Sequence, residues 1–215
     1  MTDPLRDAAD TMHTVRDRCV WTQQITHRDL VPYLVEESAE LIDAVEDGSR
    51  ADLREELGDL LWQVLFHAEI ASRDPEDPFD IDDVARGLTD KMVRRHPHVF
   101  GHAVATTPEQ VLVLWNAAKA AEKSTRTSVL DGVSERMPSL ALAQKLLGKA
   151  GAVGAARAHP GPSTDPSPTS EAELGDALLA LVVTARANGW DAERSLRERL
   201  RTLVGEIRDA EGGTA

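Results

Sequence analysis

Four carboxylates with mirrored spacing lie in the segment VEESAELIDAVEDGSRADLREELGDLLWQVLF. Glu40 and Glu56 each lie eight residues from Gly48, on opposite sides of it. Glu37 and Asp59 each lie eleven residues from the same glycine. If two antiparallel helices meet at Gly48, each pair lies at one height, at about 1.5 Å of rise per residue. A spacing of three also keeps the two acids of each helix on one face, so all four converge.

Carboxylates this close repel one another and require either protonation or a cation. The quartet contains no histidine or cysteine, and oxygen ligands favour Mg²⁺, or Mn²⁺ in its place, over zinc. The alternative is a solvated acidic face, which is the ordinary state of a glutamate-rich helix. The apolar neighbours of the acids favour a cation site; they are Leu34, Leu41, Ile42, Val45, Leu57, Leu60 and Leu61.

The sequence DGS separates two runs in which apolar residues recur at helical spacing, which predicts the end of one helix and the start of the next. We expect Gly48 to take the left-handed conformation that follows many helix ends. Ser49 can cap the second helix, with Asp52 three residues on completing a capping box. That helix should run from about Asp52 to Ser72, because nothing earlier breaks the pattern.

The composition favours helices over sheets, since alanine and leucine are abundant and only 4% of the 215 residues are aromatic. A helix should start near Ile81, and further helices are predicted at 4–18, 108–123, 139–148, 171–187 and 191–209. We therefore expect an all-α fold, a helical bundle built around the antiparallel hairpin. The apolar faces of the hairpin need partner helices, which the same chain or a second copy could supply.

The chain carries 37 acidic and 24 basic residues, a net charge of −13. This balance argues against a nucleic-acid-binding surface, which requires clustered positive charge, but it does not exclude a nucleotide substrate. Cys19 is the single cysteine, so no intramolecular disulfide can form, and we interpret it as a packed thiol in a reducing compartment. The N-terminus lacks a signal-peptide pattern and no apolar run is long enough to span a membrane. We expect a cytoplasmic protein without membrane association.

A cluster of positive charge lies in the segment KMVRRHPHVFG. Lys91 and Arg95 are four residues apart and share a helix face, with Arg94 beside them. These residues either complement a helix C-terminus or bind phosphate groups, and a nearby cation site makes phosphate binding the better explanation. Pro97 interrupts any helical spacing among the neighbouring histidines, so these should form local hydrogen bonds around a turn; they are His96, His98 and His102.

Two tryptophans are candidates for contact with a nucleotide. Trp21 lies in the less periodic segment CVWTQQITHRDL and could stack on a base or fill the core. Trp115 and Lys119 are four residues apart on a predicted helix and could offer a ring and a charge to a nucleotide. Core packing and a surface ion pair explain this second pair equally well.

The C-terminal part of the chain repeats half of the hairpin pattern. The sequence ELGDALLALVVTA, which starts at Glu173, aligns with ELGDLLWQVLFHA, which starts at Glu56, so that Asp176 matches Asp59. The opposing acids and the basic cluster have no counterpart, so this copy cannot hold a cation in the same way. We predict a catalytic helical domain, a connecting segment with one helix, a flexible Pro/Ser-rich linker and a degenerate, non-catalytic second half, at 1–123, 124–150, 151–170 and 171–215 respectively.

The combined pattern EExxE, a spacer and ExxD resembles the MazG family of nucleoside triphosphate pyrophosphohydrolases. The resemblance extends through CVWTQQITH, EELGDLLWQVLFHA and KMVRRHPHVFG to the stretch from Trp115 to Lys119. Several motifs in one order make the resemblance specific, and it covers about residues 5 to 150.

The resemblance implies an all-α, tight homodimer that uses Mg²⁺ to hydrolyse nucleoside triphosphates to the monophosphate and pyrophosphate. It implies a four-helix-bundle-like core completed by dimerisation. By matching positions, the metal ligands would be Glu37, Glu40, Glu56 and Asp59, Glu36 would lie beside them or assist the base, and Lys91 and Arg95 would hold phosphates. Two-domain members carry a complete second motif, and the loss of half of it here means that a second activity is not expected.

The expected reaction is attack of a water molecule on the α-phosphorus, with the cation neutralising phosphate oxygens and a carboxylate accepting the proton. Lys91 and Arg95 would stabilise the leaving pyrophosphate. Two alternatives keep the helices and the cation. One is a related dCTP/dUTP-type or phosphoribosyl-ATP pyrophosphohydrolase, and the other is a non-catalytic helical regulator with a structural cation.

Overall fold

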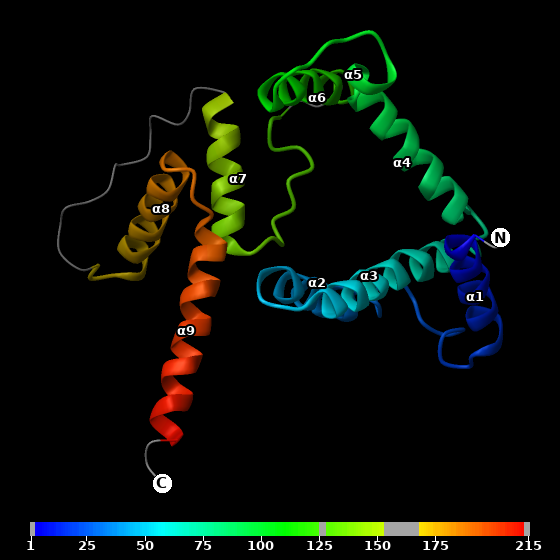
Figure 1. Cartoon of the computed structure of the whole chain (residues 1–215), viewed down its shortest axis with the longest axis horizontal. Coiled ribbons are helices and arrows are strands. Elements are labelled where there is room, and N and C mark those ends of the chain that lie inside the picture. Colours follow the sequence, from blue (N-terminus) through cyan, green and yellow to red (C-terminus); the bar gives the residue numbers. More distant parts are fainter. Residues whose placement is uncertain (1–2, 125–127, 153–167, 213–215) are drawn as a thin grey trace. The chain divides into compact units, whose positions relative to one another are not determined.

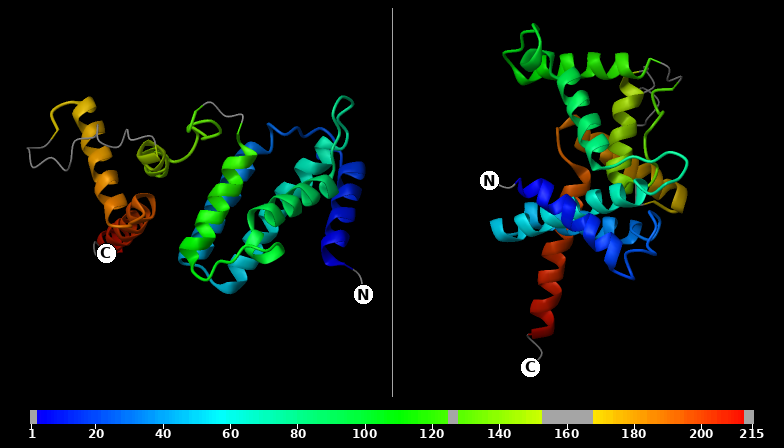
Figure 2. Two further views of the ribbon diagram at one scale, coloured as in Figure 1. Left: turned by 90° about the horizontal axis from the view of Figure 1, so that it is seen from above. Right: turned by 90° about the vertical axis from the view of Figure 1, so that its right-hand side faces the viewer.

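A computed structural model describes residues 3–124, 128–152 and 168–212, and within these ranges the chain forms helices and no strands (Figures 1 and 2). The helices are α1 (Pro4–Arg18), α2 (Val31–Glu46), α3 (Arg50–Ala71), α4 (Ile81–Arg95), α5 (Pro97–Phe100), α6 (Pro108–Glu122), α7 (Ser139–Ala152), α8 (Glu171–Ala187) and α9 (Ala192–Gly212). The predicted all-α fold is confirmed. None of the described helices is long and apolar enough to cross a membrane.

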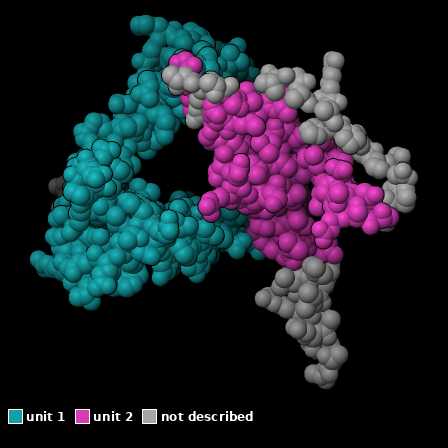
Figure 3. Space-filling model, turned by 180° about the vertical axis from the view of Figure 1, so that it is seen from behind, with its two compact units in different colours: residues 1–122 teal, residues 123–215 magenta. Residues whose placement is uncertain are grey.

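The chain divides into two compact units, residues 1–122 and 123–215 (Figure 3). In the first unit α2 and α3 lie side by side as the predicted antiparallel hairpin, and α1 packs against α3. Helix α4 packs against α3, α5 and α6. In the second unit α7, α8 and α9 pack against one another. The acids of the hairpin and the basic cluster of α4 therefore belong to the same unit.

The turn between α2 and α3 has the predicted capping box but not the predicted glycine conformation. The Ser49 hydroxyl accepts from the backbone N–H groups of Ala51 and Asp52, and Asp52 accepts from the Ser49 N–H at 2.7 Å. Positive φ occurs among the described glycines only at Gly132 and Gly189, so the left-handed prediction for Gly48 was wrong. A Cβ on Gly48 would lie 2.6 Å from Ala44 Cα. Glycine is needed here for close backbone approach rather than for its φ range.

The buried core of the first unit lies beside the C-terminal half of α3, away from the acids. It combines α1, the segment that leads into α2, and α3, through Ala9, Met12, Ile25, Leu30, Leu65 and Phe66. Phe66 and Leu30 are fully buried. The Arg16 guanidinium lies 5.7 Å from the centre of the Phe66 ring and donates to the Ile25 carbonyl at 3.1 Å. This core fixes α3, the helix that carries Glu56 and Asp59, against α1.

The apolar residues around the acids are far less covered than the core. Val35, Val45 and Leu57 are each more than half exposed, at 66%, 64% and 52%. Leu34 and Ile42 are exposed at 38% and 39%. The apolar faces of the hairpin therefore lack sufficient partner helices within the described part of one chain.

The helix bounds agree with the sequence patterns within a few residues, with one element missed. Helix α4 ends at Arg95, and a separate single turn, α5, begins at Pro97. Proline is well accommodated in a first helical turn, where its missing N–H is not needed. Most of the predicted flexible linker lies outside the described residues, and α7 continues to Ala152, two residues into it.

Candidate metal and nucleotide site

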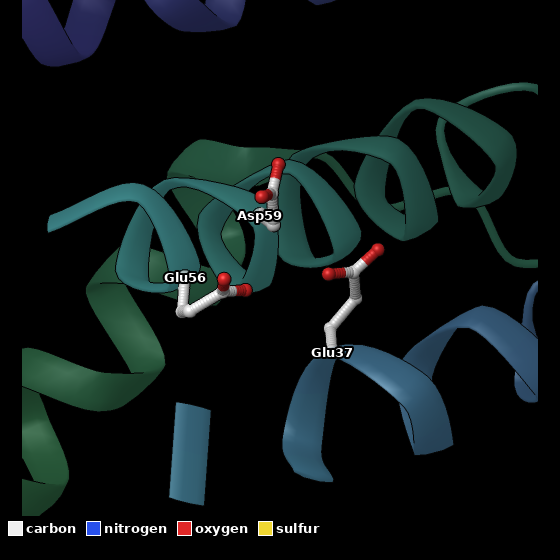
Figure 4. A group of neighbouring side chains, drawn as sticks. All are labelled: Glu37, Glu56 and Asp59. Atoms are coloured by element: carbon white, nitrogen blue, oxygen red, sulfur yellow. The ribbon is translucent and has the colours of Figure 1, made fainter. Parts of the chain in front are cut away.

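Three of the four predicted ligands meet between α2 and α3. One carboxylate oxygen each of Glu37, Glu56 and Asp59 lies within 4.8 Å of the other two. Glu37 comes from α2, and the other two come from successive turns of α3 (Figure 4). All three side chains are half-buried. The counting about Gly48 thus corresponds to a cluster of carboxylates in the structure, of which three of the predicted four are members.

Burial and mutual repulsion mark this cluster as electrostatically strained. Burial is the largest cause that raises the pKa of Glu37, followed by the charges of Asp59, Glu40, Glu56 and Glu36. The pKa of Glu56 is raised by burial first and then by Glu40 and Asp59. Glu56 Oε2 is buried and has no hydrogen-bond partner within the described structure. A cation would relieve the repulsion and satisfy this oxygen, so the donor set fits Mg²⁺ or Mn²⁺.

The two remaining acids of the EExxE motif lie at the edge of the cluster. Glu40 and Glu36 are exposed and fall outside the group whose oxygens meet within 4.8 Å. Glu40 is still close enough to raise the pKa of both Glu37 and Glu56. Glu36 contributes to the raised pKa of Glu37 but is not among the causes for Glu56. The position of Glu40 therefore differs from the prediction that all four carboxylates converge.

The raised pKa of Glu37 predicts a specific dependence of stability on pH. A raised value means that the folded protein holds this proton more tightly than the unfolded chain, so the contribution is present at low pH and lost as the pH rises through the raised pKa. Glu37→Gln should therefore raise the melting temperature of the metal-free protein at about pH 7.5 and have little effect near pH 4.5. Thermal melts in chelator across this range measure the difference. An increase that does not vary with pH would contradict the strained cluster.

The two arginines of the basic cluster pair with α6 rather than with the acids. Arg95 donates to Glu122 from Nε at 3.1 Å and from a terminal nitrogen at 2.6 Å, and its guanidinium lies 5.0 Å from the centre of the Trp115 ring. Arg94 also pairs with Glu122, at 3.4 Å. The two arginines lower the pKa of Glu122, Arg95 more than Arg94. Within the described ranges no ion pair joins Lys91 or either arginine to the acidic cluster.

The contacts of Arg95 predict that it stabilises the packing of α4 on α6. Its side chain is only 12% exposed, and charge-assisted bonds contribute more than neutral ones. Arg95→Met should lower the free energy of unfolding by about 2–3 kcal/mol. Arg86→Met removes an exposed pair with Asp83 within α4, and should change it by less than about 0.5 kcal/mol. Equal losses in urea titrations of the two variants would contradict this assignment.

The aromatic and lysine candidates lie in two places. Trp115 is half-buried between Arg95 and His96, whose ring centre lies 5.1 Å from its own. Lys91 and Lys119 are half-buried on α4 and α6. Trp21 is 49% exposed and meets Tyr33 edge to face at 6.4 Å, so it is available to a ligand and does not fill the core. A free ring face at Trp21 is compatible with stacking on a base.

Of the histidines near the basic cluster, His96 makes the predicted local hydrogen bond, whereas the buried Nδ1 of His98 has no hydrogen-bond partner within the described residues, so the prediction is wrong for that atom. His96 Nδ1 lies 2.7 Å from the Met92 carbonyl, as expected for a hydrogen bond around a turn. His98 packs near His96, with ring centres 5.6 Å apart. The group of possible metal ligands found among the described residues is the acidic one between α2 and α3.

Three polar features of this unit escaped the sequence reasoning. Glu122 was missed because its partners lie 27 and 28 residues away, and no local pattern links them. His27 and His67 form an Nδ1–Nδ1 hydrogen bond of 2.7 Å across 40 residues. Gln63 is fully buried, and a signal was available, because it is the polar residue in the apolar run LLWQVLF.

The repeated ELGD sequence of the second unit has a structural role in α8. Glu173 accepts hydrogen bonds from the backbone N–H and the hydroxyl of Thr169, at 2.7 and 2.8 Å, at the start of α8. Asp176 is exposed. The carboxylate that matches Glu56 is thus occupied in capping a helix.

The fold and the site together define an all-α protein in which carboxylates from two adjacent helices gather, and such carboxylates are the kind of oxygen donor that divalent cations such as Mg²⁺ prefer. Comparison with known proteins then assigns the family. Residues 25–100 match the MazG nucleotide pyrophosphohydrolase domain. This range contains both halves of the hairpin, all five acids and the basic cluster of α4.

Individual relatives match over nearly the whole chain. An uncharacterised 26.1 kDa protein of Streptomyces cacaoi is 47% identical over 97% of this chain and 83% of its own length. The nucleoside triphosphate pyrophosphohydrolase of Mycobacterium tuberculosis is 41% identical over 98% of this chain, which spans only 59% of that relative. The nucleoside triphosphate pyrophosphohydrolase/pyrophosphatase MazG of Thermotoga maritima is 35% identical over 90% of this chain and 79% of its length. The chain belongs to the MazG family.

Proposed function

We propose that this chain hydrolyses nucleoside triphosphates to nucleoside monophosphates and pyrophosphate in a Mg²⁺-dependent reaction. The observation that carries the proposal is the meeting of Glu37, Glu56 and Asp59 within 4.8 Å, in a chain of the MazG family. Canonical and aberrant nucleotides are both substrates in principle, which fits a role in clearing the nucleotide pool. Mn²⁺ can replace Mg²⁺ at such an all-oxygen site.

In this proposal the acids bind the cation and activate water, and the basic cluster binds the phosphate groups. Glu37, Glu56 and Asp59, joined by Glu40, hold the cation, which when bound supplies charge for the phosphate oxygens and lowers the pKa of water. One carboxylate of the EExxE or ExxD motif accepts the proton of the attacking water. Glu36 lies beside this group, where its negative charge raises the pKa of Glu37.

The leaving pyrophosphate requires positive charge, which Lys91, Arg94 and Arg95 provide. Because Arg94 and Arg95 pair with Glu122, a phosphate must either displace this carboxylate or bind the remaining donors of the guanidinium groups. Trp21 offers its exposed ring to the base, while Trp115 and Lys119 on α6 offer a ring and a charge to the nucleotide. These assignments place substrate binding on several elements of the first unit.

The test is a panel of normal and damaged nucleoside triphosphates, with release of pyrophosphate measured in Mg²⁺, in Mn²⁺ and in chelator. Cation-dependent release of pyrophosphate supports the proposal. Release from dCTP, dUTP or phosphoribosyl-ATP alone would indicate the more specialised enzyme. Absence of release from every compound, together with measurable Mn²⁺ binding, would overturn the proposal in favour of a helical regulator with a structural cation.

We also propose a homodimer, because the hairpin leaves a large apolar surface exposed. Val35, Val45 and Leu57 on α2 and α3 are exposed, as are Leu88 on α4 and Val113 on α6, at 51% and 68%. Large exposed apolar patches on a helical protein mark an interface. A monomer in sedimentation at working concentration would contradict the dimer.

The domain roles and location are proposals of the same kind. Residues 1–123 form the catalytic domain, 124–150 connect it to the Pro/Ser-rich linker at 151–170, and 171–215 are a non-catalytic second half. The occupied Glu173 carboxylate supports this last role. The single cysteine and the net charge of −13 support a cytoplasmic protein without nucleic-acid or membrane partners.

A further inference from the structure

Gln63 is buried in a way that packing alone does not explain. Its residue is 1% exposed, and neither its Oε1 nor its Nε2 has a hydrogen-bond partner within the described structure. Buried amides in folded proteins nearly always find partners, and an unpaired one lowers stability. A leucine or methionine would fill similar space without this penalty. A polar residue at this position therefore indicates a use that the cation-free structure does not display.

The position of Gln63 on α3 connects it with the acidic cluster. It lies four residues after Asp59 and seven after Glu56, so the three side chains form one stripe along the helix. Side chains on a helix lean toward its N-terminus, which directs Gln63 toward the turn that carries Asp59. Glutamine and aspartate at this spacing are known to form side-chain hydrogen bonds.

We infer that Gln63 is a positioning residue for Asp59, whose carboxylate it holds by an Nε2–H hydrogen bond when a cation occupies the cluster. One Asp59 oxygen then faces the cation, and the other accepts from Gln63. Ligating carboxylates are commonly held in this way, and loss of such a bond weakens metal binding by about 10–100-fold. The inference rests on the proposed cation site.

The next turn of α3 carries a donor that would pair with Gln63 Oε1 in the cation-bound state, although this oxygen has no partner in the cation-free structure. His67 lies four residues after Gln63 on the same stripe, and its ring is fixed by the 2.7 Å bond to His27 and by stacking at 5.0 Å with 6° between the planes. When His67 Nδ1 accepts this hydrogen bond, its Nε2 carries a proton that can be donated to Gln63 Oε1. An amide is the side chain that can accept at one end and donate at the other.

Gln63→Leu tests the inference through two measurements, because the variant should gain stability while it loses affinity for the cation. In chelator, the melting temperature should rise, by about 4 °C or more, because an unpaired buried amide is removed. The Kd for Mn²⁺, measured by the paramagnetic resonance of the free ion, should increase about 10–100-fold. Gln63→Met is the second variant, since its unbranched side chain guards against a packing defect specific to leucine.

A second glutamine supplies the matched control. Gln144 in the second unit has both amide atoms bonded, to the Trp190 carbonyl at 2.8 Å and to the Ala192 N–H at 3.1 Å. Gln144→Leu should lower the melting temperature and leave Mn²⁺ affinity unchanged. Unchanged Mn²⁺ affinity in both Gln63 variants, whatever their melting temperatures, would assign Gln63 to packing and overturn the inference.

The wild-type protein separates this inference from the proposed function. If it binds Mn²⁺ but hydrolyses no nucleotide, the proposed reaction fails while the role of Gln63 is still decided by affinity. If it binds no Mn²⁺, the cation site fails, and the inference fails with it.

Discussion

Asp59→Asn is expected to lower kcat by about 100-fold or more with nucleoside triphosphate and excess Mg²⁺. The substitution keeps the size of the side chain but removes one of the three charges that meet within 4.8 Å. A bound cation contributes several kcal/mol of charge stabilisation to the transition state. Part of this stabilisation is lost when the ion binds less tightly or in a different position, and each 1.36 kcal/mol lost lowers the rate about tenfold. Steady-state release of pyrophosphate measures the effect.

Asp176→Asn is the control for this experiment, because Asp176 occupies the matching place in the repeated ELGD sequence. It is exposed on α8 and should leave kcat unchanged. In chelator the two variants should also differ in stability. Asp59→Asn removes a charge that raises the pKa of both Glu37 and Glu56, so its melting temperature should rise. Turnover near that of the wild type in Asp59→Asn would exclude the cluster as the catalytic centre.

The cluster could be predicted from the sequence because it depends on local regularities. Two helices joined by a three-residue turn have fixed registers, so equal counts from Gly48 place Glu37 opposite Asp59. The capping box at Ser49 fixes where the second helix begins. The same reasoning was wrong about the conformation of Gly48, because a close contact with Ala44 and a left-handed φ both select glycine.

Contacts between distant residues could not be predicted in this way. The pairing of Arg95 with Glu122 depends on how α4 packs on α6, and the spacing that suggested phosphate binding also suits an ion pair. The bond between His27 and His67 crosses 40 residues. Gln63 stands out in the sequence as a polar residue in the run LLWQVLF, but only the folded chain shows that its amide is buried and unpaired.

The location of the hydrophobic core was also beyond what the sequence could predict. Apolar periodicity predicts which residues avoid water, but not whether their partner belongs to the same chain. The described core gathers around Phe66 and Leu30, while Val35 and Leu57 of the hairpin remain exposed. The first unit thus has its core beside the C-terminal half of α3 and its acidic cluster nearer the N-terminal end of that helix. Substitutions in this core should therefore change stability with little effect on activity.

Phe66→Ala should lower the free energy of unfolding of the first unit by about 3–5 kcal/mol. Phe66 is fully buried, touches the Arg16 guanidinium and packs with Trp62 at 5.3 Å between ring centres. Domains of this size are stable by about 5–15 kcal/mol, so the variant should remain largely folded at 25 °C but melt far earlier than the wild type. Urea titration at fixed protein concentration measures the loss. Phe79→Ala is the control, because Phe79 is 45% exposed, and it should shift stability by about 0.5 kcal/mol or less.

Phe66→Ala also tests whether the hydrophobic core contributes to catalysis or only to stability. Phe66 lies seven residues beyond Asp59 on α3, outside the acidic cluster. Below its melting temperature Phe66→Ala should therefore keep kcat within a few-fold of the wild type. Mg²⁺ at about one hundred times its Kd should restore about 2.7 kcal/mol, since the cation binds the folded state. This gain is smaller than the loss, so added Mg²⁺ should rescue the melting temperature only in part. A loss of kcat as large as that in Asp59→Asn, in protein shown to be folded, would mean that the core and the cluster act as one unit.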